Sequence, residues 1–145
     1  MRIAFDLDGC LVDFYGVEGW LDYLLNEDTT PYEIARPLVN LSRLARLLNK
    51  AQRNGDEIGI ISWGSKEASD AFDAAVEQAK REWLARHMPS VQWDFIHVVH
   101  YGTNKWETCG RTGILFDDEE RNRNAWENGL GFAPEQIFDI LSFFI

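Results

Sequence analysis

The feature that most constrains the fold is a set of four short apolar runs, each ending at a polar residue. The polar residues follow these runs in order: Arg2–Phe5 before Asp6, Glu57–Ile61 before Ser62, Phe95–Val99 before His100, and Thr112–Phe116 before Asp117. Runs of this kind predict buried strands. Because stretches with helical signals separate them, we expect an α/β fold with three α/β/α layers and a parallel sheet. The polar residues should then gather at the edge formed by the carboxyl ends of the strands.

The segments between the runs carry the signals of helix ends. Thr30-Pro31 predicts a helix start, and Gly55 can end the leucine pattern that follows. That pattern consists of Leu38, Leu41, Leu44 and Leu48. Ser65 is expected to cap the next helix, which must end near Pro89. A further helix is expected from Glu119 to Asn128, with Gly129 as its stop.

The length of the chain allows one compact core. With 145 residues, of which 46% are hydrophobic, we expect a single domain over residues 1–145. Residues 14–54, between the first two runs, are expected to form a small helical insertion. The apolar tail from Pro134 to Ile145 fits either a last helix or an edge strand. Its exposed part could support a homodimer.

The charge and the cysteine content narrow the function classes. A formal net charge of −10 and a pI near 4.6 disfavour stable binding to duplex nucleic acid or to an anionic membrane. Cys10 and Cys109 have no spacing typical of a zinc site or a disulfide framework. We expect reduced thiols and a cytoplasmic protein, because neither a leader nor an apolar run of the ~20 residues that a membrane span needs is apparent.

The first run leads into a pair of carboxylates that could share a phosphoryl-transfer reaction. Asp6 and Asp8 flank Leu7, and Gly9 follows, so the backbone can approach a ligand closely. One carboxylate could attack phosphorus, and the other could protonate the leaving oxygen and later activate water. An acidic pair after a strand also occurs in ordinary turns. The pair therefore needs support from other residues.

That support comes from polar residues near the ends of the other runs. Ser62, with backbone N–H groups near Trp63 and Gly64, could bind phosphate oxygens. Lys105 could neutralise charge on the nucleophile and on the phosphoryl group. Asp117 with Asp6 could hold Mg²⁺ through hard oxygen ligands. Taken singly, Ser62 could simply end a strand, Lys105 could be a solvated loop charge, and Asp117-Asp118 could be acids of a helix first turn.

The ordered set resembles the haloacid dehalogenase superfamily of phosphatases, over roughly the whole chain. The specific part is DxDGxxxD, from Asp6 to Asp13. The resemblance implies a Rossmann-like domain in which Asp6 is the nucleophile and Asp8 the general acid/base, whose backbone carbonyl also reaches Mg²⁺. It further implies phosphate contacts from Ser62 and Lys105. Asp117 would be the remaining protein ligand to the metal, with Asp118 beside it through a water.

The second half of the chain looks like the small deoxyribonucleotidase branch, which removes phosphate from nucleoside monophosphates. The likeness rests on Arg81-Glu82-Trp83-Leu84, His87, Phe95–Val99, Lys105 and Gly113–Asp118. That branch has a helical cap between its first two motifs, but here only residues 14–54 lie between them and part of this segment must return to the sheet, so the cap is reduced or absent. Aromatic residues could then stack on a base, namely Phe14, Tyr15, Trp20 and Trp63. An open site could instead accept a phosphorylated nucleic-acid end.

Two other functions fit parts of the pattern. A receiver-type phospho-acceptor domain also uses aspartate, serine or threonine, lysine and magnesium, but its paired acid comes first along the chain, whereas here it comes last. A catalytically silent acidic interaction protein could keep the same fold. The favoured hypothesis is a magnesium-dependent phosphomonoester hydrolase with an aspartyl-phosphate intermediate. Its expected substrate is a nucleotide or another phosphorylated nucleic-acid component, and its expected cofactor is Mg²⁺.

Overall fold

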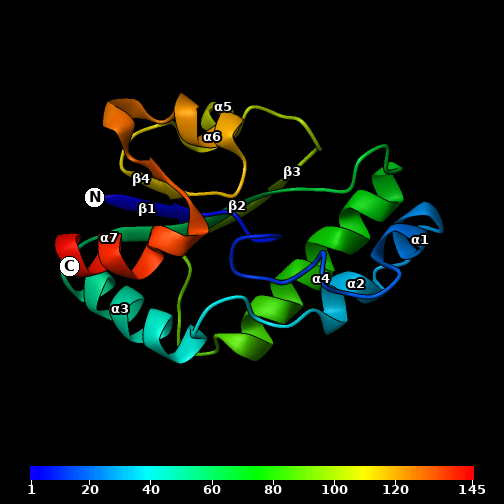
Figure 1. The fold of residues 1–145 in the computed structure, drawn as a ribbon, viewed down its shortest axis with the longest axis horizontal. Coiled ribbons are helices and arrows are strands. Elements are labelled where there is room, and N and C mark those ends of the chain that lie inside the picture. The colour runs from blue at the N-terminus through cyan, green and yellow to red at the C-terminus, as the bar shows by residue number, and fades with distance from the viewer.

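A parallel five-stranded sheet forms the centre of the molecule in a computed structural model that describes residues 1–145 (Figure 1). The strands lie in the order β3-β2-β1-β4-β5. Their bounds are β1 Arg2–Phe5, β2 Glu57–Trp63, β3 Phe95–Val99, β4 Ile114–Phe116 and β5 Gly131–Phe132. All four neighbouring pairs are parallel. The α/β fold with a parallel sheet that the sequence predicts is therefore confirmed.

Side chains alternate between two apolar layers, one on each face of the sheet. Ile3 and Phe5 belong to the larger core, which is covered by α3 (Leu41–Arg53), α4 (Asp70–His87) and α7 (Ile137–Phe144). Ala4 belongs to a smaller core together with Cys109, the last residue of α5 (Lys105–Cys109), and Trp126, which directly follows α6 (Glu120–Ala125). Figure 1 shows α5 and α6 on the side of the sheet opposite α3 and α7. This alternation follows from the two-residue period of a strand.

The strand register brings the predicted strand-end residues to one edge. Phe5 pairs with Ile60 of β2 and with Phe116 of β4. The Asp6 N–H then donates to the Phe116 carbonyl at 2.8 Å, so the ladder continues one residue past β1. Because β1 lies between β2 and β4, the residues that follow these paired positions meet at the carboxyl edge of the sheet, around the end of β1.

Two helix starts differ from the sequence prediction. Thr30-Pro31 opens only the short helix α2 (Thr30–Ile34), and α3 begins later, with Asn40 accepting a hydrogen bond from the Arg43 N–H. Leu38 lies before α3 and is 46% exposed, so it does not belong to the buried face of that helix. Ser69, and not Ser65, caps α4, because the segment between them is used to cross from the sheet to the helical layer.

The last third of the chain also differs in detail. The helix expected from Glu119 to Asn128 is shorter, since α6 ends at Ala125 and a 3₁₀ turn, η1 (Glu127–Gly129), follows. The two-residue strand β5 was not predicted. The tail forms a second 3₁₀ turn, η2 (Pro134–Gln136), and then α7, so the helical alternative for it is correct. Phe143 in α7 remains 81% exposed.

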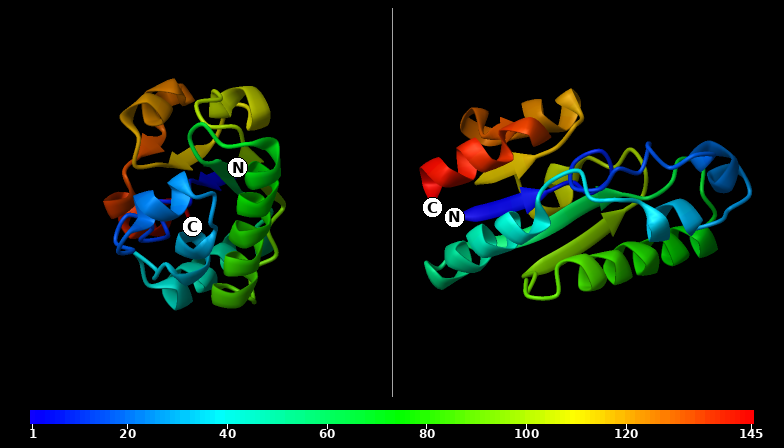
Figure 2. Two further views of the ribbon diagram at one scale, coloured as in Figure 1. Left: turned by 90° about the vertical axis from the view of Figure 1, so that its right-hand side faces the viewer. Right: turned by 60° about the horizontal axis from the view of Figure 1, so that its bottom comes forward.

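The segment expected as an insertion divides into two parts. Helix α3 packs in the larger core through Leu44, Leu48 and Ala51. In contrast, α1 (Trp20–Leu25) and α2 lie near α4 at the end of the molecule away from both termini (Figures 1 and 2). Phe14 and Tyr32 join this part to α4 through a separate apolar cluster. Among all the helices, none has the length and apolar character that crossing a membrane requires.

Candidate active site

A tight turn after β1 presents Asp6 and Asp8. The Leu7 carbonyl accepts hydrogen bonds from three successive N–H groups, those of Cys10, Leu11 and Val12, at 3.2, 2.9 and 3.0 Å. Gly9 has a φ of +76°, and a Cβ there would lie 2.4 Å from an Asp118 carboxylate oxygen. Glycine is therefore required both by the backbone conformation and by the close approach of Asp118.

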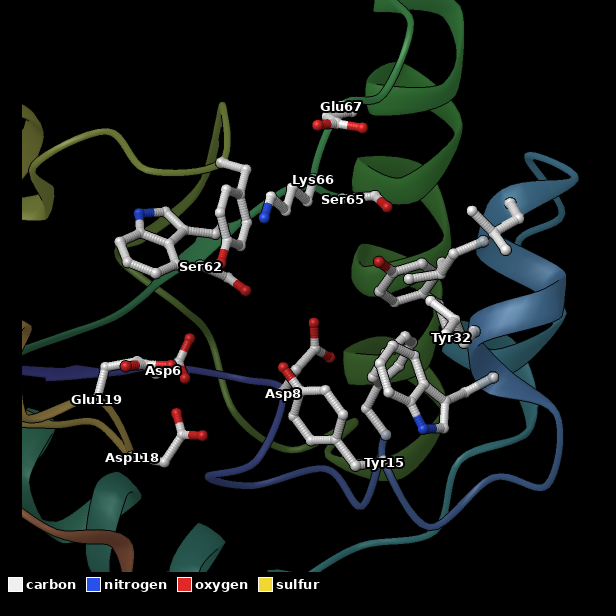
Figure 3. Close-up of a pocket in the computed structure, with 18 of the residues that line it drawn as sticks. Asp6, Asp8, Tyr15, Tyr32, Ser62, Ser65, Lys66, Glu67, Asp118 and Glu119 are labelled. Atoms are coloured by element: carbon white, nitrogen blue, oxygen red, sulfur yellow. The ribbon is translucent and has the colours of Figure 1, made fainter.

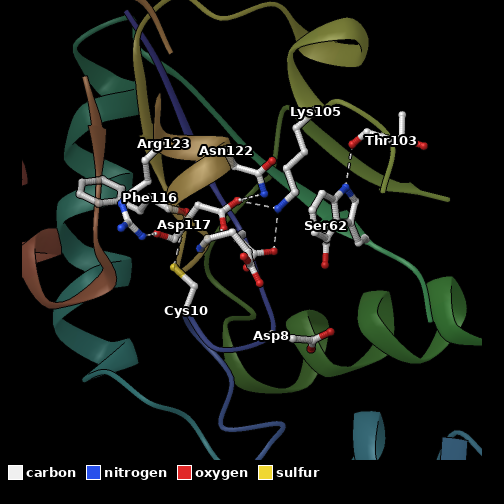
Figure 4. A network of polar contacts seen from close by, with 12 residues as sticks. Asp8, Cys10, Ser62, Thr103, Lys105, Phe116, Asp117, Asn122 and Arg123 are labelled. Carbon is white, nitrogen blue, oxygen red and sulfur yellow. Dashed lines mark hydrogen bonds and ion pairs between the residues drawn. The ribbon is translucent and has the colours of Figure 1, made fainter. Parts of the chain in front are cut away.

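Lys105 ties two of the strand-end aspartates together (Figure 4). Its ammonium donates to Asp6 Oδ1 at 2.9 Å and to Asp117 Oδ2 at 2.7 Å, and its side chain is almost fully buried. Burial alone would lower the pKa of Lys105, but the charges of Asp6 and Asp117 outweigh burial and raise that pKa above its ordinary value. Asn122 Nδ2 and the Glu119 N–H also donate to the Asp117 carboxylate. Lys105 is thus a fixed cation beside Asp6.

Three carboxylates form a cluster whose donor atoms suit a hard divalent cation. Oxygen atoms of Asp6, Asp117 and Asp118 lie within 4.8 Å of one another. Burial and the nearby Asp6 charge raise the pKa of Asp117 to about 6. Partial burial and a hydrogen bond with Asp6 raise the pKa of Asp118 to about 8. Such a group needs a proton or a cation to offset its repulsion, and carboxylate oxygens are the ligands that Mg²⁺ prefers, so these residues fit the ion.

A second buried lysine, which the sequence interpretation missed, lies on the other side of the site. Lys80 of α4 forms an ion pair with Asp8 Oδ2 at 2.9 Å, and its ammonium donates to Ser62 Oγ at 2.7 Å and to the Trp63 carbonyl at 2.6 Å. Burial raises the pKa of Asp8 above its ordinary value, while the charge of Lys80 opposes this shift. Lys80 lies four residues after Val76 and three before Trp83, on the apolar face of the helix. A lysine on the apolar face of a helix was therefore the sequence signal that could have identified Lys80 as a buried, paired cation.

Trp63 and Gly64 have roles in the structure beyond those expected. The Trp63 Nε1–H donates to the Thr103 carbonyl at 2.7 Å, two residues before Lys105, so the indole holds the loop that leads to this lysine. The Gly64 N–H donates to the Val99 carbonyl at 2.7 Å. The expectation that the Gly64 N–H faces a phosphate is therefore corrected, because strand pairing with β3 already uses this donor.

A pocket of about 310 Å³ lies over the site (Figure 3). The carboxylates of Asp6, Asp8 and Asp118 line one end, together with Ser62 and Lys105. The opposite end is aromatic and apolar, and its lining residues come mainly from the segment before α2. These residues are Phe14, Tyr15, Trp20, Leu21, Leu24, Leu25 and Tyr32. Trp63 and Tyr101, with ring centroids 5.1 Å apart, complete the wall.

The structural comparison supports the fold. The chain is similar to D,D-heptose 1,7-bisphosphate phosphatase from Burkholderia thailandensis, whose crystal structure aligns with a TM-score of 0.50 and 15% sequence identity. The alignment covers 86% of this chain and 70% of that one. A scan against protein-family models finds no match, and a search of curated proteins finds none either. At this identity the likeness shows a shared α/β fold.

Proposed function

We propose that the protein is a magnesium-dependent phosphomonoester hydrolase of the haloacid dehalogenase superfamily, with Asp6 as its nucleophile. The observation that carries this proposal is the position of Asp6, which contacts the fixed cation Lys105 and lies within the same cluster as the carboxylates of Asp117 and Asp118. One Asp6 oxygen is held by Lys105 at 2.9 Å, and the side chain lines the pocket. A carboxylate oriented in this way can attack a phosphorus atom without a large reorganisation.

The reaction would proceed in two displacements. In the first, an Asp6 oxygen bonds to phosphorus, the ester P–O bond breaks, and the leaving oxygen takes a proton from the Asp8 carboxyl. In the second, a water molecule attacks the same phosphorus, Asp8 accepts a proton from this water, and the bond between phosphorus and the Asp6 oxygen breaks. Phosphate then leaves, and the Asp6 carboxylate is restored. Lys105 would remain charged throughout and offset the negative charge around Asp6.

The carboxylate cluster would hold the metal ion. We expect the carboxylates of Asp6 and Asp117 and the backbone carbonyl of Asp8 to bind the ion directly. Asp118 would contact it through a water. Bound Mg²⁺ would supply positive charge that offsets the charge of the phosphate oxygens. The absence of a side chain at Gly9 leaves the space in which the Asp118 carboxylate lies beside those of Asp6 and Asp117. Asn122 and the Glu119 N–H restrain Asp117 in its place.

The substrate class is inferred from the shape and lining of the pocket. Its aromatic end suits a flat, largely apolar group attached to the phosphate, and a nucleoside meets this description. The segment from Phe14 to Asn40 would serve as a reduced cap, since it supplies most of this wall. Tyr15, Leu21 and Leu25 are largely exposed on the pocket lining, so a nucleic-acid end could also be accommodated there.

The proposal is tested by phosphate release from p-nitrophenyl phosphate with and without Mg²⁺. A panel should follow, with nucleoside monophosphates, sugar phosphates and oligonucleotides that carry a terminal phosphate. We expect Asp6→Asn to abolish turnover, while the exposed Asp139→Asn in α7 serves as a matched control. Turnover by Asp6→Asn at the wild-type rate would refute the mechanism. A stable phosphoryl group on wild-type Asp6 without release would favour the receiver-type function.

A further inference from the structure

Lys80 is a buried cation for which the reaction outlined above has no use. Only 1% of its side chain is exposed, although it lies in the middle of the long helix α4. A buried ammonium is costly unless hydrogen bonds and opposite charge surround it. Its surroundings meet this requirement, because a carboxylate, a hydroxyl and a backbone carbonyl lie within 2.9 Å. The Tyr32 ring centroid is 5.3 Å from the same nitrogen.

The ammonium of Lys80 is engaged by protein groups: two hydrogen bonds and one ion pair. An ammonium group has three N–H donors and no acceptor. One donor goes to Ser62 Oγ and one to the Trp63 carbonyl, and the charge of the ammonium is paired with Asp8 Oδ2 at 2.9 Å. Lys80 does not line the pocket, so a phosphate bound there would meet Ser62 and Lys105 and not this ammonium. Lys80 therefore differs from Lys105, which has two carboxylate partners.

The contact with Lys80 dictates how Ser62 can act. A hydroxyl has one O–H donor and can also accept hydrogen bonds. Because Lys80 has no acceptor, the Ser62 oxygen must accept in this pair, and its own hydrogen points elsewhere. Ser62 also lines the pocket (Figure 3). Its O–H can therefore donate to a phosphate oxygen there.

The same ammonium restrains Asp8. It holds Oδ2, so the other oxygen, Oδ1, is the one left to exchange a proton with the substrate or with water. Asp8 follows β1 and Ser62 belongs to β2, so one side chain of α4 couples the two strand ends. The Trp63 carbonyl, as the third partner, holds the end of β2 in the same network.

We propose that Lys80 is a positioning residue: it makes Ser62 a hydrogen-bond donor toward the phosphate and orients Asp8, without binding the phosphate itself. This inference rests on the proposed phosphohydrolase function. It assigns distinct tasks to the two buried lysines, since Lys105 neutralises charge at Asp6 and Lys80 sets the geometry of Asp8 and Ser62.

The first test is kinetic and uses p-nitrophenyl phosphate with Mg²⁺. We expect Lys80→Met to lower kcat/KM about 100-fold, the size of effect seen when one preorganised donor is lost. In a Ser62→Ala background the same substitution should cost less than about tenfold, because one of its two routes of action is already gone. Equal losses in the two backgrounds would overturn the inference. Lys50→Met, at an exposed site on α3, is the control.

A second kinetic test separates the charge from the packing. Lys80→Ala removes the ammonium and leaves space that a small amine can enter. Added propylamine should restore at least about tenfold in kcat/KM, whereas propanol should not, because it lacks the charge and the three donors. Equal rescue by propanol would mean that Lys80 only fills space, which would overturn the proposal.

The third test needs neither a variant nor turnover. A crystal structure of the wild-type protein with Mg²⁺ and tungstate should show Lys80 still in contact with Asp8, Ser62 and the Trp63 carbonyl, and Ser62 Oγ within hydrogen-bond distance of the anion. A direct bond from Lys80 to tungstate would overturn the inference. Absence of turnover by the wild type would instead refute the proposed function, so the two failures are distinguishable.

Discussion

Replacement of Lys105 by methionine tests whether this buried cation holds the acidic site together. The substitution keeps the length and removes the charge that contacts Asp6 at 2.9 Å and Asp117 at 2.7 Å. Loss of one partner from a buried ion pair costs about 3–5 kcal/mol. At about 3 °C per kcal/mol for a chain of this size, the melting temperature should fall by roughly 10–15 °C.

The loss should depend on pH in a defined direction. The pKa of Asp117 in the folded protein is raised from 3.8 to about 6. A carboxyl group with a raised pKa binds more protons in the folded protein than in the unfolded chain. Its charged form therefore destabilises the fold, and this effect disappears as the pH falls from above the folded-state pKa to below the unfolded-state pKa. Without Lys105 this pKa should rise further. The stability deficit of Lys105→Met should therefore be larger near neutral pH than at about pH 5.

Differential scanning calorimetry in the presence of EDTA measures this effect directly. The exposed Lys50→Met variant is the matched control and should change the free energy of unfolding by no more than about 0.5 kcal/mol. If Lys105→Met melts within a degree or two of this control at neutral pH, the buried ion pairs do not stabilise the site as argued.

The contacts around the pocket should also make three other changes measurable. Gly9→Ala should destabilise the fold by about 1–2 kcal/mol and weaken Mg²⁺ binding, as measured by calorimetry. Gly55→Ala, also at positive φ but with open space around it, should leave Mg²⁺ binding unchanged. Equal Mg²⁺ affinities of the two variants would contradict the role of Gly9. Trp63→Phe, which removes the hydrogen bond to the Thr103 carbonyl, should lower kcat about tenfold, whereas the control Trp106→Phe should leave kcat unchanged. An unchanged kcat of Trp63→Phe would show that this hydrogen bond does not position Lys105. The rise in melting temperature on adding Mg²⁺ should grow between about pH 6 and pH 9, because the raised pKa of Asp118, about 8, makes protons compete with the ion; a rise independent of pH would contradict this competition.

The strand-end part of the site could be predicted because parallel strands impose it. Asp6, Ser62 and Asp117 each follow or end an apolar run, and the register of β1 with β2 and β4 brings such positions together. Their placement thus depends on a short-range pattern and on one general property of parallel sheets. Lys105 follows a loop and begins α5, so its position beside Asp6 was expected from the charge that phosphoryl transfer requires and not from a strand end.

Other features depend on contacts between layers that a linear pattern does not contain. Lys80 falls on the apolar face of α4, but the sequence does not show that this face meets the turn after β1 or that Asp8 pairs with the lysine there. Ser65 and Ser69 are both able to cap α4, and only the path of the chain after β2 selects the second. β5 has two residues and pairs with a single neighbour, so its sequence carries almost no strand signal.

The most direct test of the central claim is to trap the phosphoryl group on Asp6. Asp8→Asn should still accept phosphate from p-nitrophenyl phosphate, whose leaving group needs little protonation, but should activate water poorly. After acid quenching, peptide mass spectrometry should find one phosphoryl group on the peptide that contains Asp6, and none in the Asp6→Asn, Asp8→Asn double variant. A phosphoryl group on another residue, or equal labelling of the double variant, would contradict the assignment of Asp6 as the nucleophile.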